Sequence, residues 1–194
     1  MLIFLDMLMK IKRYKWRGSE RGAAKTHNAK ETPNSGATWH TKGDAIAEMY
    51  KVENKYTGSQ KTPKLTVAEI EKGILDAKRH SLYYVLRVET SAAIVVFITE
   101  EFFVEMIDML GKDAPVGICE TETVCKGKTF PQFDAFDVYT CSMRLKRGWN
   151  GYDGPCIYYE RVFFGESREK EDVRQVLVLM LEDDFMWLLG EYKS

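Results

Sequence analysis

Residues 45–111 alternate between strand-like and helix-like hydrophobic patterns, and this alternation limits the fold more than any other feature of the chain. The strand-like segments are 45–49, 50–56, 83–88 and 92–98, and the helix-like segments are 66–80 and 99–111. In segment 66–80 apolar residues recur at helical spacing, at Val67, Ile70, Ile74 and Ala77. Thr66 and Glu69 form the signature of a capping box at its start. Strands interrupted by helices favour an α/β sheet with helices on its faces.

The secondary structure of two other segments can be interpreted in two ways. Segments 45–49 and 50–56 form either one bent hairpin or one long strand, and 176–181 is either a buried strand or a helix. Residues 12–29 predict a basic helix that ends before Pro33, followed by a loop at 32–37. We interpret His27 on this helix as an ordinary surface histidine, with a DNA contact as the alternative. Segments 138–145 and 157–164 are predicted strands.

The chain has the length and composition of one soluble globular domain, with 194 residues, 45% hydrophobic and 29% charged. We assign residues 1–111 to an α/β core. Residues 112–194 are assigned to a C-terminal, mostly β or α+β extension packed on that core, and its role is not readable from the sequence. Residues 1–9 are apolar but interrupted by Asp6, and they are too short to span a bilayer.

Charge and cysteine content indicate the environment. Residues 1–61 carry twelve Lys/Arg against six Asp/Glu, a net +6, and residues 62–194 carry sixteen against twenty-three, a net −7. A basic N-terminal part fits a polyanionic partner. The four cysteines form no C-x-x-C pair, which favours reduced thiols in a cytoplasmic protein, with a structural zinc site as the alternative.

Segment 35–55 carries the side chains that metal-dependent hydrolysis of a phosphodiester requires. A glycine-bearing turn precedes Asp44, and Glu53 and Lys55 follow on the next strand-like segment. Because side chains alternate along a strand, Glu53 and Lys55 should share one face while Asn54 points to the other. Mg²⁺ prefers oxygen ligands and usually takes one or two carboxylates from a protein. The plain alternative is a charged surface pair on an exposed strand.

Four short motifs occur in a recognisable order. They are WRGSER at 16–21, TPNSGA at 32–37, KGD at 42–44 and ENK at 53–55. This series resembles the PD-(D/E)XK nuclease superfamily, and more narrowly the archaeal-type Holliday junction resolvases and related phage nucleases. The resemblance extends through about Gly111 and implies a restriction-endonuclease-like mixed central sheet flanked by helices.

The resemblance also implies roles for individual residues. Glu20, Asp44 and Glu53 would ligate Mg²⁺, or Mn²⁺ in its place, together with the backbone carbonyl of Asn54. Lys55 would orient or help deprotonate the attacking water and neutralise charge on the scissile phosphate. Ser35 would lie near the phosphate or cover the site in a paired subunit. DNA phosphates would be contacted by Lys12, Arg13, Lys15, Arg17, Arg21, Lys25, Lys42 and Thr57.

We therefore expect an intracellular, Mg²⁺-dependent DNA endonuclease, with resolution of Holliday junctions as the leading activity. Two symmetric cuts across a junction would require a homodimer. The alternatives are a nuclease of the same fold that acts on linear duplex or single-stranded DNA in repair or restriction, and a nucleic-acid-binding protein without cleavage.

Overall fold

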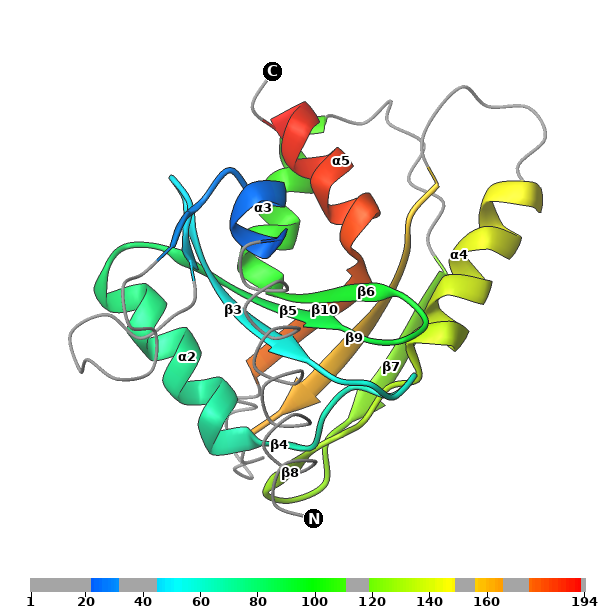
Figure 1. The fold of residues 1–194 in the computed structure, drawn as a ribbon, viewed down its shortest axis with the longest axis horizontal. Helices are drawn as coiled ribbons and strands as arrows, with labels where there is room; N and C mark the ends of the chain where they lie inside the picture. The colour runs from blue at the N-terminus through cyan, green and yellow to red at the C-terminus, as the bar shows by residue number, and fades with distance from the viewer. Residues whose placement is uncertain (1–21, 32–44, 111–118, 149–155, 166–174, 193–194) are drawn as a thin grey trace, which may run out of the picture.

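The computed structural model describes residues 22–31, 45–110, 119–148, 156–165 and 175–192. They form one eight-stranded mixed sheet with helices on both faces (Figure 1). In spatial order its strands are β1 (Lys30–Glu31), β2 (Ala45–Ile46), β3 (Tyr50–Tyr56), β5 (Tyr83–Glu89), β6 (Ile94–Thr99), β10 (Gln175–Leu181), β9 (Tyr158–Phe164) and β7 (Cys119–Val124). The helices are α2 (Val67–Arg79), α3 (Glu100–Leu110), α4 (Ala135–Gly148) and α5 (Glu182–Tyr192), and residues 22–26 are also helical. A separate pair is formed by β4 (Leu65–Thr66) and β8 (Thr129–Phe130).

The first half of the sheet consists of a hairpin followed by a helical crossover. β2 pairs antiparallel with β3, so segments 45–49 and 50–56 form a hairpin and not one long strand. α2 then leads to β5, which lies parallel to β3, and β6 returns antiparallel to β5. Mixed pairing with helices on the faces confirms the predicted α/β class, and the arrangement is compatible with a restriction-endonuclease-like fold.

The start of α2 and the end of the first helical segment can be compared with the predictions from the sequence. The capping box at the start of α2 is confirmed, because the Glu69 N–H donates to Thr66 Oγ1 and the Thr66 N–H donates to the Glu69 carboxylate. Of the predicted helix 12–29, residues 12–21 lie outside the described residues, and the helical residues that follow stop at Thr26, earlier than expected. Asn28 has φ 46°, a left-handed conformation that asparagine tolerates, and the chain then enters β1.

Strands from residues 119–181 complete the same sheet. β10 lies between β6 and β9 and pairs antiparallel with both, and β7 lies parallel to β9 at the edge. Segment 176–181 is therefore a strand, which decides between the two interpretations of the sequence. Five consecutive residues of β10 are buried, from Leu177 to Leu181, as expected for a strand that is covered on both faces.

The predicted strand at 138–145 is wrong, because these residues lie within α4. Valine, tyrosine and threonine at 138–140 suggested a strand, but the positions that pack inward follow helical spacing. They are Ala135, Val138, Ser142 and Leu145. Asp134 caps the helix, since the Phe136 N–H donates to its carboxylate at 3.0 Å. This cap and the basic last turn are the signals that could have identified the helix.

The helices divide into two layers (Figure 1). α2 and α4 cover one face of the sheet, where Ile70 and Val138 belong to the same buried cluster as Leu86 of β5. α3, α5 and residues 22–26 cover the other face, where Phe102 and Phe185 pack with β-strand residues. No helix among the described residues is long and apolar enough to cross a membrane.

A buried polar network lies under the α5 layer. The Glu182 carboxylate accepts from Arg87 Nε at 2.6 Å and from His27 Nε2 at 2.9 Å, and Arg87 Nη1 donates to Asn54 Oδ1 at 2.8 Å. His27 is therefore buried and not the surface residue that the sequence suggested. Burial alone would raise the pKa of Glu182, but the hydrogen bonds and charges of His27 and Arg87 outweigh it and hold this pKa below its ordinary value.

Replacing Glu182→Gln is expected to lower the free energy of unfolding by about 3 kcal/mol at pH 7, because Arg87 loses its buried counter-charge. Since the folded-state pKa of Glu182 is lowered, its contribution is present above about pH 5 and is lost as the pH falls through that pKa. The difference between wild type and variant should therefore shrink in acid. Urea unfolding at pH 7 and in acid measures both effects.

Asp183→Asn is the matched control, because Asp183 is exposed in the same first turn of α5. Its effect should stay below about 1 kcal/mol, the usual range for a charge at a helix N-terminus. Equal losses in the two variants would show that the helix dipole, and not the buried network, accounts for the stability.

Candidate functional site

β3 places Glu53 and Lys55 side by side on the face that α2 covers. Glu53 Oε1 lies 2.8 Å from Lys55 Nζ, and the two side chains are 28% and 36% exposed. Lys51, two residues earlier on the same face, is buried and forms an ion pair with Asp76 of α2. The prediction that Glu53 and Lys55 share a face is therefore confirmed, and both remain within reach of solvent.

Tyr84 of β5 fixes the second oxygen of Glu53. Its hydroxyl donates to Glu53 Oε2 at 2.9 Å, and its ring is buried beneath α2. Gly73 permits this packing, because a Cβ at that position would lie 2.5 Å from the Tyr84 ring. Sequence reasoning missed Tyr84, since nothing in one strand reveals which side chain of the neighbouring strand lies opposite.

A second carboxylate, that of Glu69, acts on the same lysine. The backbone N–H and the hydroxyl of Thr66 both donate to Glu69. These hydrogen bonds, with a smaller contribution from the positive charge of Lys55, lower the pKa of Glu69. The charge of Lys55, which contacts Glu53, therefore also acts on Glu69 at the start of α2, for which the sequence predicts only a capping role.

Asn54 points to the opposite face of β3, as predicted. Its side chain accepts from Arg87 in the buried network, so it forms part of the core that supports the strand. The implied role of Asn54 in metal binding would use its backbone carbonyl. The two faces of β3 therefore separate a solvent-accessible charged pair from a buried structural network.

Several predicted site residues fall outside the described ranges. They are Glu20, Ser35 and Asp44, together with the DNA-contact candidates Lys12, Arg13, Lys15, Arg17, Arg21 and Lys42. Asp44 is bonded to Ala45, and Ala45 is the register partner of Val52, which precedes Glu53.

Two further DNA-contact candidates are described. Lys25 is exposed. Thr57 follows β3, and its hydroxyl oxygen accepts from the Ser59 N–H at 3.1 Å.

The described part of the predicted site supplies one of the ligands that a Mg²⁺ site would need. Within the described residues, no group of three or more His, Cys, Asp and Glu side chains is placed to hold a metal. Glu53 offers one partly exposed carboxylate whose orientation Tyr84 fixes. Mg²⁺ typically takes one or two carboxylates and fills its other positions with water and phosphate oxygens. Glu53 is compatible with that chemistry, and the remaining predicted carboxylates are Glu20 and Asp44.

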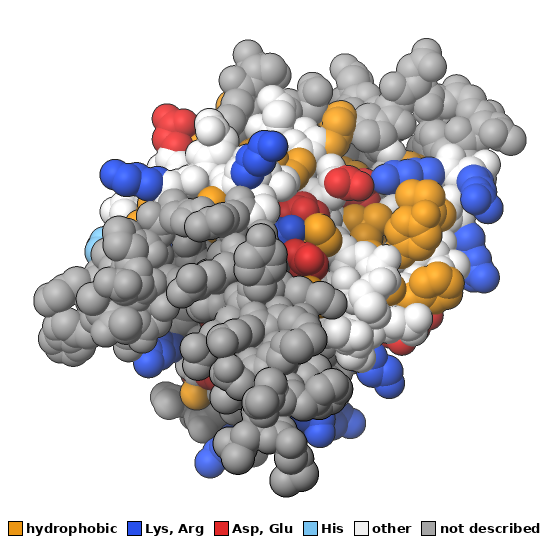
Figure 2. Space-filling view, in the orientation of Figure 1, with side chains coloured by type: hydrophobic (Ala, Val, Ile, Leu, Met, Phe, Trp, Pro, Cys, Tyr) orange, Lys and Arg blue, Asp and Glu red, His pale blue; other side chains and the backbone are white. Residues whose placement is uncertain are grey.

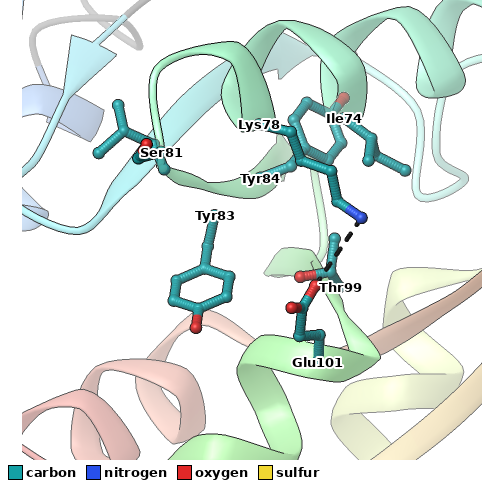
Figure 3. A pocket seen from close by; sticks show the side chains of 8 residues that line it. Ile74, Lys78, Ser81, Tyr83, Tyr84, Thr99 and Glu101 are labelled. Carbon is teal, nitrogen blue, oxygen red and sulfur yellow. Dashed lines mark ion pairs between the residues drawn. The ribbon is translucent and has the colours of Figure 1, made fainter.

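A pocket of about 340 Å³ lies at the other end of α2, against the start of α3 (Figure 3). Lys78 and Glu101 face each other across it at 3.8 Å, and Thr99 Oγ1 is buried there without a hydrogen-bond partner in the described structure. Neither Glu53 nor Lys55 lines this pocket. Only the Tyr84 side chain belongs to both, so the pocket is distinct from the predicted site.

Comparison of the chain with protein-family models, with curated proteins and with solved structures gave no match.

Replacing Gly73→Ala is expected to lower the free energy of unfolding by about 1–3 kcal/mol, because the added Cβ would overlap the Tyr84 ring. Gly190→Ala in α5 is the matched control. A Cβ at Gly190 would meet nothing within 4 Å, so this variant should gain up to about 1 kcal/mol from helix propensity. Urea unfolding measures both. A stabilised Gly73→Ala would show that Tyr84 can move away from α2.

Proposed function

We propose that this protein is a Mg²⁺-dependent DNA endonuclease, with branched DNA such as a Holliday junction as its leading substrate. One observation supports the proposal most directly. Glu53 and Lys55 lie in contact on one face of β3, within a hairpin whose other strand begins directly after Asp44. A carboxylate for a cation beside an amine for a phosphate is the donor set expected for metal-assisted phosphodiester hydrolysis.

Each described residue has a part in this proposal. Glu53 Oε1, which contacts Lys55 Nζ at 2.8 Å, would exchange that contact for the cation, while the hydrogen bond from Tyr84 holds the other carboxylate oxygen. Bound Mg²⁺ would supply Lewis acidity and lower the pKa of a water ligand. The Lys55 ammonium would neutralise charge on the phosphate as a P–O bond to water forms and the P–O bond to the leaving oxygen breaks. Glu20, Asp44 and the Asn54 carbonyl would complete the ligand set.

The substrate and the assembly follow from the same proposal. The net +6 of residues 1–61 favours a polyanion over a neutral substrate. Two symmetric cuts across a junction need two sites, so the active form would be a homodimer in the cytoplasm, where it reaches DNA. A nuclease of the same fold that acts on linear duplex or single strands would use the same residues.

A nucleic-acid-binding protein without cleavage is the second candidate. It is favoured by the net +6 of residues 1–61, which suits a polyanion without requiring catalysis. In this candidate the contact between Lys55 and Glu53 is a plain surface ion pair worth less than about 1 kcal/mol. The two candidates predict different results: loss of the Glu53 or Lys55 side chain lowers a rate of DNA cleavage only if the protein is an endonuclease.

The test incubates the purified protein with a four-way junction, linear duplex and single strands, in Mg²⁺ or in EDTA. Asp44→Asn, Glu53→Gln and Lys55→Ala should each lower the cleavage rate by about 10²-fold or more, because each removes a charge that acts on the reacting phosphate. Lys64→Ala is the control, since Lys64 is an exposed lysine outside the site, and its rate should match wild type.

Cleavage that survives Glu53→Gln or Lys55→Ala would contradict the site assignment. Binding without cleavage in Mg²⁺ and in Mn²⁺ would favour the second candidate. Paired nicks in the junction alone would distinguish a resolvase from a general nuclease, and gel filtration would test the homodimer.

A further inference from the structure

α4 carries an exposed surface that the proposed hydrolytic site does not use. It consists of Phe136, Tyr139, Arg144 and Arg147, which we call the α4 outer face. Phe136 and Tyr139 are 52% and 42% exposed, and both arginines are exposed. Helical spacing places Phe136, Arg144 and Arg147 on the side of α4 turned away from the sheet and Tyr139 on the adjoining flank. Figure 2 shows hydrophobic and Lys/Arg side chains together over this helix.

The fold does not need these side chains. α4 packs on the sheet through Val138 and Leu145, and it is tied to α5 by Lys146 and Ser142, which both donate to Asp184. In contrast, Arg144 and Arg147 form no ion pair within the part of the chain that the structure describes. Two large exposed rings and two uncompensated cations on one helix face indicate a binding surface.

The chemistry of the α4 outer face fits unpaired nucleotides. Aromatic rings stack on bases of any sequence, and arginines neutralise the phosphates beside them. A duplex hides the faces of its bases within the stack, so exposed rings gain little from it. Asp137, the one acidic residue of α4, is exposed in the first turn beside Phe136, and the last turn carries Lys146 and Arg147, so the positive charge gathers toward the end of the helix.

The position of α4 connects this surface with the proposed site. α4 and α2 pack on the same face of the sheet, which is also the face that carries Glu53 and Lys55. α4 lies over β9 and β10, and β9 is four strands from β3 in spatial order. At about 4.8 Å between neighbouring strands, β3 and β9 lie about 19 Å apart. At the duplex rise of about 3.4 Å per nucleotide, about six stacked nucleotides would cover that distance, and an extended unpaired strand would need fewer.

We propose that the α4 outer face binds the unpaired strand of a DNA substrate, with bases stacked on Phe136 and Tyr139 and phosphates held by Arg144 and Arg147. The inference extends the proposed nuclease function by assigning a place for single-stranded parts of its substrate. Binding in the absence of metal tests it separately from cleavage.

The experiment measures fluorescence anisotropy of a labelled twenty-nucleotide oligothymidine and of a duplex of equal length, with the full chain in EDTA. Phe136→Ala/Tyr139→Ala should weaken binding of the single strand at least tenfold and of the duplex less than twofold. Arg144→Gln/Arg147→Gln should reduce the slope of log affinity against log salt by about 1.4 on the single strand, because two phosphate contacts are lost.

Val104→Ala/Met109→Ala is the matched control, since it removes two exposed apolar side chains from α3, and its affinity should match wild type. Absence of oligothymidine binding by the wild type, an unchanged affinity of the aromatic variant, or an equal loss on duplex would overturn the inference. Thermal unfolding checks that each variant is folded. Failure of Glu53→Gln to reduce cleavage would contradict the proposed active site but leave the anisotropy result intact.

Discussion

The alternation of side chains along β3 is the constraint on which the rest of the structure depends. Tyr50, Val52 and Asn54 face the layer of α3 and α5, whereas Lys51, Glu53 and Lys55 face α2. A shift of one residue would turn three charges into an aromatic core and would move the buried residues beneath a charged helix face. The register that buries Tyr50, Val52 and Asn54 of β3 therefore also places Glu53 and Lys55 on the opposite face. The same strand pairing determines both the stability of the strand and the geometry of the site.

The network around Glu182 supports that register from the opposite face. It joins residues that lie far apart in the sequence, because His27, Asn54 and Arg87 all converge near the first residue of α5. Burial of an arginine is tolerated only when its charge and hydrogen bonds are satisfied. Asn54 and Arg87 are register partners in the parallel pair β3–β5, so the network holds the two strands that carry Glu53 and Tyr84.

Local features of the sequence predicted the fold best. The Thr66–Glu69 capping box and the alternation of β3 act within a few residues, and the structure has both. The strand predicted at 138–145 was wrong because β-branched and aromatic residues were given more weight than the Asp134 cap and the inward spacing of Val138 and Leu145. Propensity is a weak guide where a tertiary surface covers one side of a segment.

Long-range features of the site had no local signal. The hydrogen bond from Tyr84 to Glu53 depends on strand pairing, and the burial of His27 depends on a carboxylate 155 residues away. A single sequence gives the face on which a side chain lies, but not the partner that folding brings to it. For the same reason the sequence suggests a capping role for Glu69 but not the effect of the Lys55 charge on its pKa.

The order of strands has a consequence for biosynthesis. β10 is an interior strand of the sheet, between β6 and β9, and its residue Leu177 pairs with Thr99, 78 positions earlier. During translation, β6 would emerge long before β10 and would present an open edge with unpaired backbone groups. The sheet can therefore close only after residues 175–181 have been synthesised.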